Sequence, residues 1–294
     1  MRIERFAPSP TGLLHLGHAY SAAMCWLGAN RHNGSFRLRL EDLDHSRCKP
    51  EFYDAVEEDL RWLGLHWDGK ILRQSTRLTA YASALARLEC EGLLYPCVCT
   101  RRDLRDAVNA PQEGAGRLVD GILYPGTCRD RAIEWDAACA LRLNMAAAIE
   151  YLGGYSAVSR LGFENTDATQ TKSHILLSGE QLMRSAGDVV LRRKDGVPAY
   201  HLSVIVDDAH QNITHVTRGE DLLESTAIHR LLQALLELPV PGYHHHRLIR
   251  DEAGKRLAKR DDARSIRSLR EAGASRADIF RHLGLSDLAA ESAV

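Results

Sequence analysis

Two histidines, His15 and His18, flank a Leu-Gly pair directly after a Pro-Ser-Pro-Thr-Gly turn in the stretch APSPTGLLHLGHA. We expect this turn to join a first strand to a first helix, which places both rings in the first turn of that helix. A helix N-terminus presents unpaired backbone N–H groups and a partial positive charge, and imidazoles there can donate hydrogen bonds to phosphate. Gly17 would let a nucleotide approach the backbone. The histidines could instead only satisfy the end of the helix, but the preceding turn favours a phosphate site.

Three cysteines and a tyrosine are spaced as metal ligands could be. The segments PCVC and YPGTC supply Cys97, Cys99 and Cys128, which are candidate thiolate ligands of a tetrahedral zinc ion. Tyr124 is the candidate fourth ligand. From spacing alone, three unrelated thiols are an equally good interpretation. The histidine run at 244–246 is assigned no metal, because consecutive residues of an extended segment point to opposite faces.

The C-terminal part carries a local excess of positive charge. Between Arg247 and Arg281 there are 11 basic and 6 acidic side chains, in a chain whose net charge is −1. Arg264, Arg267 and Arg270 recur every three residues, so they share one face of a predicted helix. That face could meet a phosphate backbone or simply be solvated, and the sequence leaves both interpretations open.

The elements that must position these residues alternate along the first third of the chain. Residues 2–8 and 36–44 have the pattern of strands, whereas 16–34, 50–65 and 76–94 have the apolar spacing of helices. Strand, helix, strand, helix predicts an α/β fold with a parallel, doubly wound sheet.

The alternation breaks between Pro96 and about Ala186, so we interpret this stretch as an insertion. After it we expect three strands and a helix to complete the sheet, at 188–193, 198–208, 213–217 and 223–238.

Length and composition exclude several classes of protein. The chain has 294 residues, 45% hydrophobic and 26% charged, which is enough for one well-packed core with an inserted subdomain. No stretch approaches 18 uninterrupted apolar residues, and the charged N-terminus with its prolines is unlike a signal peptide. Seven cysteines, an odd number, fit a reducing compartment. We therefore expect a cytoplasmic protein with no membrane segment, and its nearly balanced charge neither suggests nor excludes a nucleic-acid partner.

Four blocks of sequence resemble class I glutamyl-tRNA synthetases. The blocks RFAPSPTGLLHLGHA, RLEDLDHSR, DDAHQNITHVTRGEDLL and GKRLAKR stand in that family's order and span residues 5–260. Only 34 residues follow Arg260, whereas full-length members of the family continue into a large anticodon-binding region. This shortened plan resembles the glutamyl-Q tRNA(Asp) synthetases, which attach glutamate to the queuosine base in the anticodon of tRNA(Asp).

The resemblance implies a Rossmann-like core divided into four segments. Residues 1–95 and 187–240 would be the two halves of the catalytic domain, and 96–186 an inserted subdomain that binds zinc and contacts tRNA. Residues 241–294 would hold the lysine loop and a short basic helical segment. Cys97, Cys99, Tyr124 and Cys128 then resemble the family's zinc site, with one structural zinc per chain.

The resemblance also implies a glutamate pocket. Glutamate has two carboxylates and one ammonium, so the pocket needs cations and at least one anion, and the planar guanidinium of arginine suits a carboxylate. The candidates lie near predicted strand ends at one edge of the sheet: Arg5, Ser9, Glu41, Tyr200 and Arg218. We expect Tyr200 on the strand at 198–208. Glu41 would hold the ammonium and the arginines the carboxylates, with the assignment of each arginine left open.

ATP, accompanied by Mg²⁺, would contact His15, Gly17 and His18. In GKRLAKR, Lys259 would contact the ATP phosphates, so the predicted catalytic residues are His15, His18 and Lys259. This block departs from the family's KMSKS pattern, because Arg256 stands in first place and Ala258 where serine is usual.

The implied reaction begins with ATP and L-glutamate, which form glutamyl adenylate and pyrophosphate. A hydroxyl of queuosine then attacks the activated carbonyl, in a protein expected to be a monomer. One rival is a truncated glutamyl-tRNA synthetase that charges the 3′ end of a tRNA, and the other is a non-catalytic tRNA-binding paralogue. The missing anticodon region argues against the first, and the intact set His15, His18, Glu41, Arg218 and Lys259 argues against the second.

Overall fold

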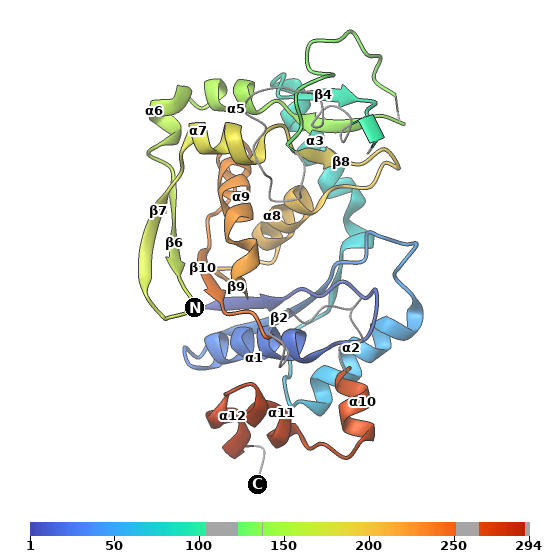
Figure 1. The fold of residues 1–294 in the computed structure, drawn as a ribbon, viewed down its shortest axis with the longest axis vertical. Coiled ribbons are helices and arrows are strands. Elements are labelled where there is room, and N and C mark those ends of the chain that lie inside the picture. The colour runs from blue at the N-terminus through green and yellow to red at the C-terminus, as the bar shows by residue number, and fades with distance from the viewer. Residues whose placement is uncertain (101, 104–122, 137, 251–264, 292–294) are drawn as a thin grey trace.

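The structure is a computed structural model that describes the chain except residues 101, 104–122, 137, 251–264 and 292–294 (Figure 1). In the described residues, no helix combines the length and the apolar character needed to cross a membrane.

A parallel sheet forms from the N-terminal third of the chain. Its strands, in spatial order, are β1 (Ile3–Phe6), β2 (Ser35–Leu40) and β3 (Leu72–Arg73). The helices of this part are α1 (Leu16–Asn30), α2 (Pro50–Trp62) and α3 (Leu78–Cys90), and the short helix η1 (Gln74–Arg77) leads into α3. These elements confirm the predicted strand and helix alternation.

Local sequence explains where these helices begin and end. Pro50 starts α2, where its missing N–H is no loss, and Val56 and Leu60 are buried on one face of that helix. After α1 the chain turns through Asn33, which has a φ of 47°, into Gly34. A Cβ on Gly34 would lie 2.1 Å from the carbonyl oxygen of Arg2, so the close approach to the start of β1 requires glycine.

A second sheet continues beside β1. Its spatial order is β7 (Lys172–Leu176), β6 (Gly162–Thr166), β10 (Gly242–His246) and β9 (His215–Gly219). β6, β10 and β9 run parallel, whereas β7 is antiparallel to β6. The Thr214 N–H, just before β9, donates to the carbonyl oxygen of Ile3 at 3.0 Å, so the two sheets meet edge to edge.

A third, antiparallel sheet carries the region with the paired cysteines. Its order is β4 (Leu94–Cys97), β5 (Ala140–Leu143) and β8 (Val190–Arg192). Between β5 and β8 the chain forms the β6–β7 hairpin and four short helical segments: α5 (Met145–Tyr151), α6 (Gly154–Val158), α7 (Gly179–Gln181) and η2 (Leu182–Ala186).

Strand pairing crosses the predicted segment boundaries. β8, which falls in the predicted second half of the catalytic domain, pairs with β5 of the predicted insertion. β6 falls in the predicted insertion but pairs with β10, which falls in the predicted C-terminal segment. The division into four segments therefore stays a prediction. In both of these places, strands from different predicted segments pair within one sheet.

The prediction of a strand at 198–208 is wrong, because Tyr200–His210 forms the helix α8. Pro198 and Ala199 precede it, and Tyr200 is its first residue. Apolar and polar residues of α8 are buried alike, including Ile205 and Asp207, so the helix has no polar face that would reveal its period. Tyr200 consequently reaches the sheet edge from a helix N-terminus.

Helices cover both faces of the parallel strands (Figure 1). One apolar core contains Ile3 together with residues of α3, α8 and α9 (Leu223–Leu235), which follows the short helix η3 (Glu220–Leu222). The other core contains Phe6 together with residues of α1, α2 and the C-terminal helices, which are α10 (Ile266–Glu271), α11 (Arg276–His282) and α12 (Ser286–Glu291).

Candidate active site

A cavity of about 580 Å³ opens where β1, β2 and β9 end. Its lining includes eight residues that the sequence predicts for the site: Arg5, Ser9, His15, Gly17, His18, Glu41, Tyr200 and Arg218. Lys259, the remaining predicted member, lies outside the described residues. The carboxyl edge of the parallel strands thus collects the candidates from four distant parts of the sequence.

His15 and His18 close the N-terminus of α1. Nδ1 of His15 accepts from the Gly17 N–H at 3.1 Å, and Nδ1 of His18 accepts from the His15 N–H at 3.2 Å. A backbone N–H can only donate, so in this geometry each ring keeps its Nδ1 unprotonated and its proton on Nε2. The rings therefore satisfy the helix end while each carries its proton on Nε2, and the two interpretations of the motif are compatible. A Cβ on Gly17 would lie 3.0 Å from the His15 ring, so glycine also makes room for this cap.

Arg5 already has a counter-ion within the protein. Its Nε donates to Oδ1 of Asp208 at 2.9 Å, and Nη1 of Arg39 donates to the same oxygen at 2.8 Å. Burial raises the pKa of Asp208, but Arg5 and Arg39 lower it more, so the pKa lies below its usual range and Asp208 is an anion. Two buried guanidinium groups therefore share one carboxylate beside the cavity.

Glu41 follows β2 at the cavity wall. Its Oε1 lies 3.8 Å from Nη2 of Arg39, and its backbone N–H donates to the carbonyl oxygen of Pro8 at 3.0 Å. Burial raises the pKa of Glu41 to about 7, although Arg39 and Arg5 lower it. A ligand ammonium beside Glu41 would stabilise its ionised form.

Arg218, at the end of β9, is surrounded by neutral acceptors. It exposes only 6% of its surface, and its N–H groups donate to five atoms: Tyr200 Oη, His229 Nδ1, His245 Nε2, Thr226 Oγ1 and the Leu222 carbonyl oxygen. Within the part of the chain that the structure describes, no acidic side chain forms an ion pair with Arg218. A buried cation without an anion at the wall of a cavity can attract a ligand carboxylate or phosphate, which would replace one or more of these neutral acceptors.

Tyr200 lies beside Arg218 in the lining of the cavity. Its hydroxyl accepts from Nη1 of Arg218 at 3.2 Å, and burial raises its pKa, so it stays a neutral phenol. Ser9 lies in the turn after β1, where its carbonyl oxygen accepts from the Thr11 N–H at 2.8 Å. Both line the same cavity as Glu41.

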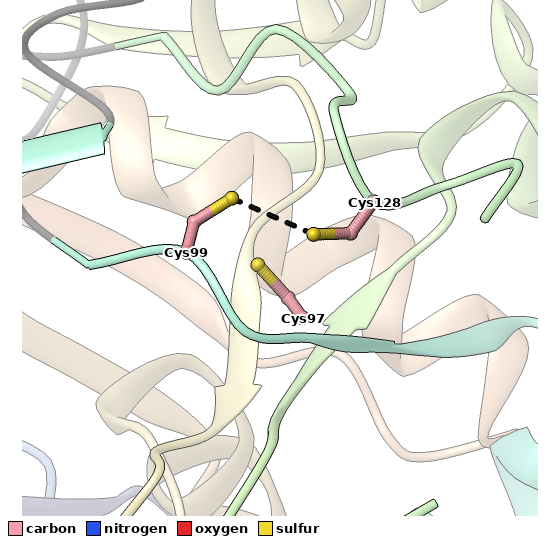
Figure 2. A group of neighbouring side chains, drawn as sticks. All are labelled: Cys97, Cys99 and Cys128. Atoms are coloured by element: carbon pink, nitrogen blue, oxygen red, sulfur yellow. Dashed lines mark hydrogen bonds between the residues drawn. The ribbon is translucent and has the colours of Figure 1, made fainter. Parts of the chain in front are cut away.

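The three cysteines predicted as metal ligands lie together (Figure 2), and the Tyr124 hydroxyl lies next to them. The sulfur atoms of Cys97, Cys99 and Cys128 are all within 4.8 Å of one another, and those of Cys99 and Cys128 are 3.5 Å apart. The Tyr124 Oη lies 3.5 Å from the sulfur of Cys97 and 3.8 Å from that of Cys99. Tetrahedral zinc, with Zn–S bonds of about 2.3 Å, separates its ligand atoms by about 3.8 Å, so these four side chains match such a site.

A guanidinium group lies over the ring of the unusual ligand candidate. Cζ of Arg142 is 3.7 Å from the Tyr124 ring centroid, and Nη1 of Arg142 donates to the Asp188 carbonyl oxygen at 2.7 Å. The Tyr124 hydroxyl oxygen accepts from the Cys128 N–H at 2.7 Å. These contacts fix the ring, but burial and the hydrogen bonds with Cys128 and Cys97 raise the pKa of the Tyr124 hydroxyl, so a bound metal ion would have to displace the phenol proton.

The predicted basic helical face is partly occupied within the protein. Arg267 and Arg270 of α10 both pair with Glu58 of α2, at 3.1 and 2.7 Å. Arg264 lies outside the described residues. The 244–246 histidines are extended in β10 as expected, and their ring contacts go to separate partners: Gln170, Asn165 and Ser21.

Sequence reasoning missed the acidic partner of Arg5 and the acceptors of Arg218. Asp208 was quoted in a supposed strand and in a family-like block but given no role, although two adjacent acidic residues in an apolar run are a signal of buried charge pairs. His229 and His245 gave no signal, since single histidines in an apolar helix and an extended run carry no spacing that points to Arg218.

Comparison with known proteins identifies the family of this chain. Residues 3–293 match the family model described as tRNA synthetases class I (E and Q), catalytic domain. The glutamyl-Q tRNA(Asp) synthetase of Rhodobacter capsulatus is 51% identical over 289 residues, covering 96% of this chain and 100% of that protein. The protein of the same name from Nocardia farcinica is 44% identical, covering 92% of this chain and 80% of that protein.

Solved structures agree in fold. A glutamate tRNA ligase from Elizabethkingia meningosepticum, crystallised in complex with its amino acid, superposes with a TM-score of 0.66 at 29% identity. The alignment covers 88% of this chain and 52% of that one, so the chain spans about half the length of that protein. A methionyl-tRNA synthetase from Mycobacterium tuberculosis, with a TM-score of 0.60 and 13% identity over 96% of this chain and 63% of that one, shares the fold.

Proposed function

Because the chain belongs to the class I tRNA synthetase (E and Q) family, with relatives named glutamyl-Q tRNA(Asp) synthetase, we propose that it activates L-glutamate with ATP and transfers it to queuosine in tRNA(Asp). In the first step a carboxylate oxygen of glutamate attacks the α-phosphorus of ATP, and pyrophosphate leaves. In the second, a queuosine hydroxyl attacks the adenylate carbonyl, and AMP leaves. The proposal retains the sequence expectation of a monomer in the cytoplasm.

The observation that carries this proposal is the state of Arg218. Glutamate has a side-chain carboxylate, which only accepts hydrogen bonds, where glutamine has a neutral amide of the same size that also donates, so a site that selects glutamate needs a cation not already neutralised. Arg218 is such a cation, since its hydrogen-bond partners among the described residues are all neutral, whereas Arg5 is paired with Asp208. We therefore assign the side-chain carboxylate to Arg218, with Tyr200 beside it.

The other residues follow from the charges of the ligand. Glu41 would receive the ammonium, whose charge favours the ionised form of a carboxyl with a pKa of about 7. Arg5 and Ser9 would contact the rest of the amino acid. His15 and His18 would donate their Nε2–H groups to phosphate oxygens as negative charge builds during attack, an electrostatic contribution that needs no proton transfer.

Positioning supplies much of the remaining rate enhancement. Gly17 would lie beside the nucleotide, Mg²⁺ would accompany ATP, and Lys259 would reach the phosphates as the sequence predicts. A doubly wound, Rossmann-like core accounts for the site's place at the carboxyl edge of the strands.

We also propose one structural zinc held by Cys97, Cys99, Tyr124 and Cys128. The ligand separations support it, as does the buried setting of Cys97 and Cys128. Zinc would tie the β4 strand to the segment 124–128 and supply folding energy, with no part in the adenylate chemistry. The tRNA-contacting role of this inserted subdomain belongs to the same proposal.

The test measures transfer of labelled glutamate to three substrates: tRNA(Asp) with queuosine, tRNA(Asp) without it, and tRNA(Glu). We expect labelling of the first alone. Charging of tRNA(Glu) instead would support the rival that aminoacylates the 3′ end. Failure to exchange pyrophosphate with glutamate in the presence of each tRNA would support a non-catalytic protein.

A further inference from the structure

Arg218 is held by two histidines that come from different elements. Its Nε donates to Nε2 of His245 in β10 at 3.2 Å, and its Nη1 donates to Nδ1 of His229 in α9 at 3.3 Å. Both rings are buried, with 1% of the surface of each residue exposed. Guanidinium N–H groups can only donate, so both of these ring nitrogens must be unprotonated.

Each histidine donates its remaining proton to a second partner. Nδ1 of His245 lies 2.6 Å from Oδ1 of Asn165, and Nε2 of His229 lies 3.2 Å from Nδ1 of His201. With Nε2 of His245 facing Arg218, the proton of His245 is on Nδ1 and donates to the Asn165 amide oxygen. Asn165 thus fixes the tautomer that can accept from Arg218.

The pairing of strands β9, β10 and β6 places Arg218, His245 and Asn165 side by side across the sheet. Arg218 in β9 is in register with His245 in β10, and β10 in turn pairs with β6, where Asn165 is in register with Tyr243. Asn165 is buried, with 4% of its surface exposed. It belongs to the stretch 145–181, which the sequence left without a role.

We propose that Asn165 and His245 are positioning residues that orient Arg218 without neutralising it, and so set the preference for an amino acid with a side-chain carboxylate over its amide. This rests on the proposed function. The amide of Asn165 carries no net charge, and burial together with the charge of Arg218 lowers the pKa of His245 to about 3. The positive charge of Arg218 consequently stays available for the ligand.

The decisive variant is Asn165→Asp, which keeps an acceptor for the His245 proton but places a buried negative charge next to the pair. We expect the ratio of kcat/KM for glutamate to that for glutamine, measured by pyrophosphate exchange, to fall about tenfold or more, mainly through a higher KM for glutamate. Asn165→Ser, a neutral acceptor, should largely retain the ratio. Asn144→Asp is the matched control, because Asn144 caps α5 and aspartate caps a helix equally well.

An unchanged ratio in a folded Asn165→Asp protein would overturn the inference while leaving the proposed function intact. Failure of the wild-type protein to activate glutamate would instead overturn the proposed function. A second measurement needs no substitution: ¹⁵N-histidine spectra of the wild-type protein should show His245 protonated on Nδ1 and not on Nε2. A proton on Nε2 would remove the acceptor for Arg218 and refute the proposal even if Asn165→Asp fails to fold.

Discussion

Replacement of Arg218 by glutamine tests the charge that the site presents to its amino acid. Arg218→Gln keeps a polar side chain that can still donate to part of the neutral surroundings, but it removes the cation. A hydrogen bond to a charged group is worth about 1.5–3 kcal/mol, and a guanidinium group can make two to one carboxylate, so we expect a loss of about 3–6 kcal/mol of transition-state binding. This corresponds to a decrease of about 160- to 25,000-fold in kcat/KM for glutamate.

Glutamine should respond differently, since its neutral amide gains little from a guanidinium group and leaves that buried cation unpaired in the wild-type protein. Pyrophosphate exchange with glutamate, glutamine and aspartate measures all three preferences. Glutamine and aspartate should be poor substrates of the wild-type protein, and the preference for glutamate over glutamine should shrink in Arg218→Gln. Arg267→Gln, which removes a surface ion pair with Glu58, is the control. If Arg218→Gln kept the wild-type ratio of glutamate to glutamine, Arg218 would not select the side chain and the pocket would have to be redrawn.

Three further expectations concern other parts of the molecule. His18→Ala should slow adenylate formation about a hundredfold, as measured by pyrophosphate exchange, but an altered glutamate-to-glutamine ratio would contradict a role confined to phosphate. Cys99→Ser should lose most of the bound zinc and lower the melting temperature, whereas the exposed Cys90→Ser should do neither; metal analysis showing no zinc in the wild-type protein would reject the site. Asp59 in α2 is fully buried, its carboxyl oxygens have no hydrogen-bond partner among the described residues, and burial raises its pKa to about 6. That pKa exceeds the value in the unfolded chain, so proton binding by Asp59 stabilises the folded state. This contribution to the free energy of unfolding is fully present below about pH 4 and is lost as the pH rises through 6, a change of about 3 kcal/mol. Asp59→Asn should therefore raise the melting temperature at pH 8 and change it little at pH 4, unlike the exposed Asp287→Asn, and equal effects at both pH values would contradict this sign.

The first third of the fold could be predicted because each of its elements shows its own period. β1, α1, β2, α2 and α3 all lie where the apolar spacing placed them. The sites at their ends followed, since Arg5, His15, His18 and Glu41 fall at strand and helix boundaries. The sequence indicates directly which residues lie at the ends of strands, and in a parallel sheet the carboxyl ends of the strands are where ligands bind.

Among the later elements, β8, β9 and α9 also lie close to their predicted positions, whereas α8 was wrongly predicted as a strand and β6 and β10 were not predicted, for a physical reason. α8 is buried on every side, and its polar residues are matched by distant partners: Asp207 accepts from Gln74, Arg77 and Tyr81. No polar face therefore marks its helical period, and the run resembles a buried strand. β6 and β10 are short, and β10 is mostly histidine, so neither has the β-branched composition that identifies a strand.

The neutral surroundings of Arg218 could not be predicted for a similar reason. They come from α8, β10, α9 and the short helix η3, and they depend on which nitrogen of each ring faces the guanidinium. Side-chain tautomers are set by three-dimensional partners such as Asn165, and no spacing in the sequence records them.

The order of strands in the second sheet has a consequence for synthesis on the ribosome. β10 lies between β6 and β9, yet it is the last of the four strands in the sequence. Until residues 242–246 have emerged from the ribosome, the strand that lies between β6 and β9 is missing. Each of these two strands then has an exposed edge whose backbone groups are unpaired. Docking of β10 then closes both edges in one late, long-range event, which makes the final sheet slow to complete and any chain ending before residue 242 prone to associate with other strands.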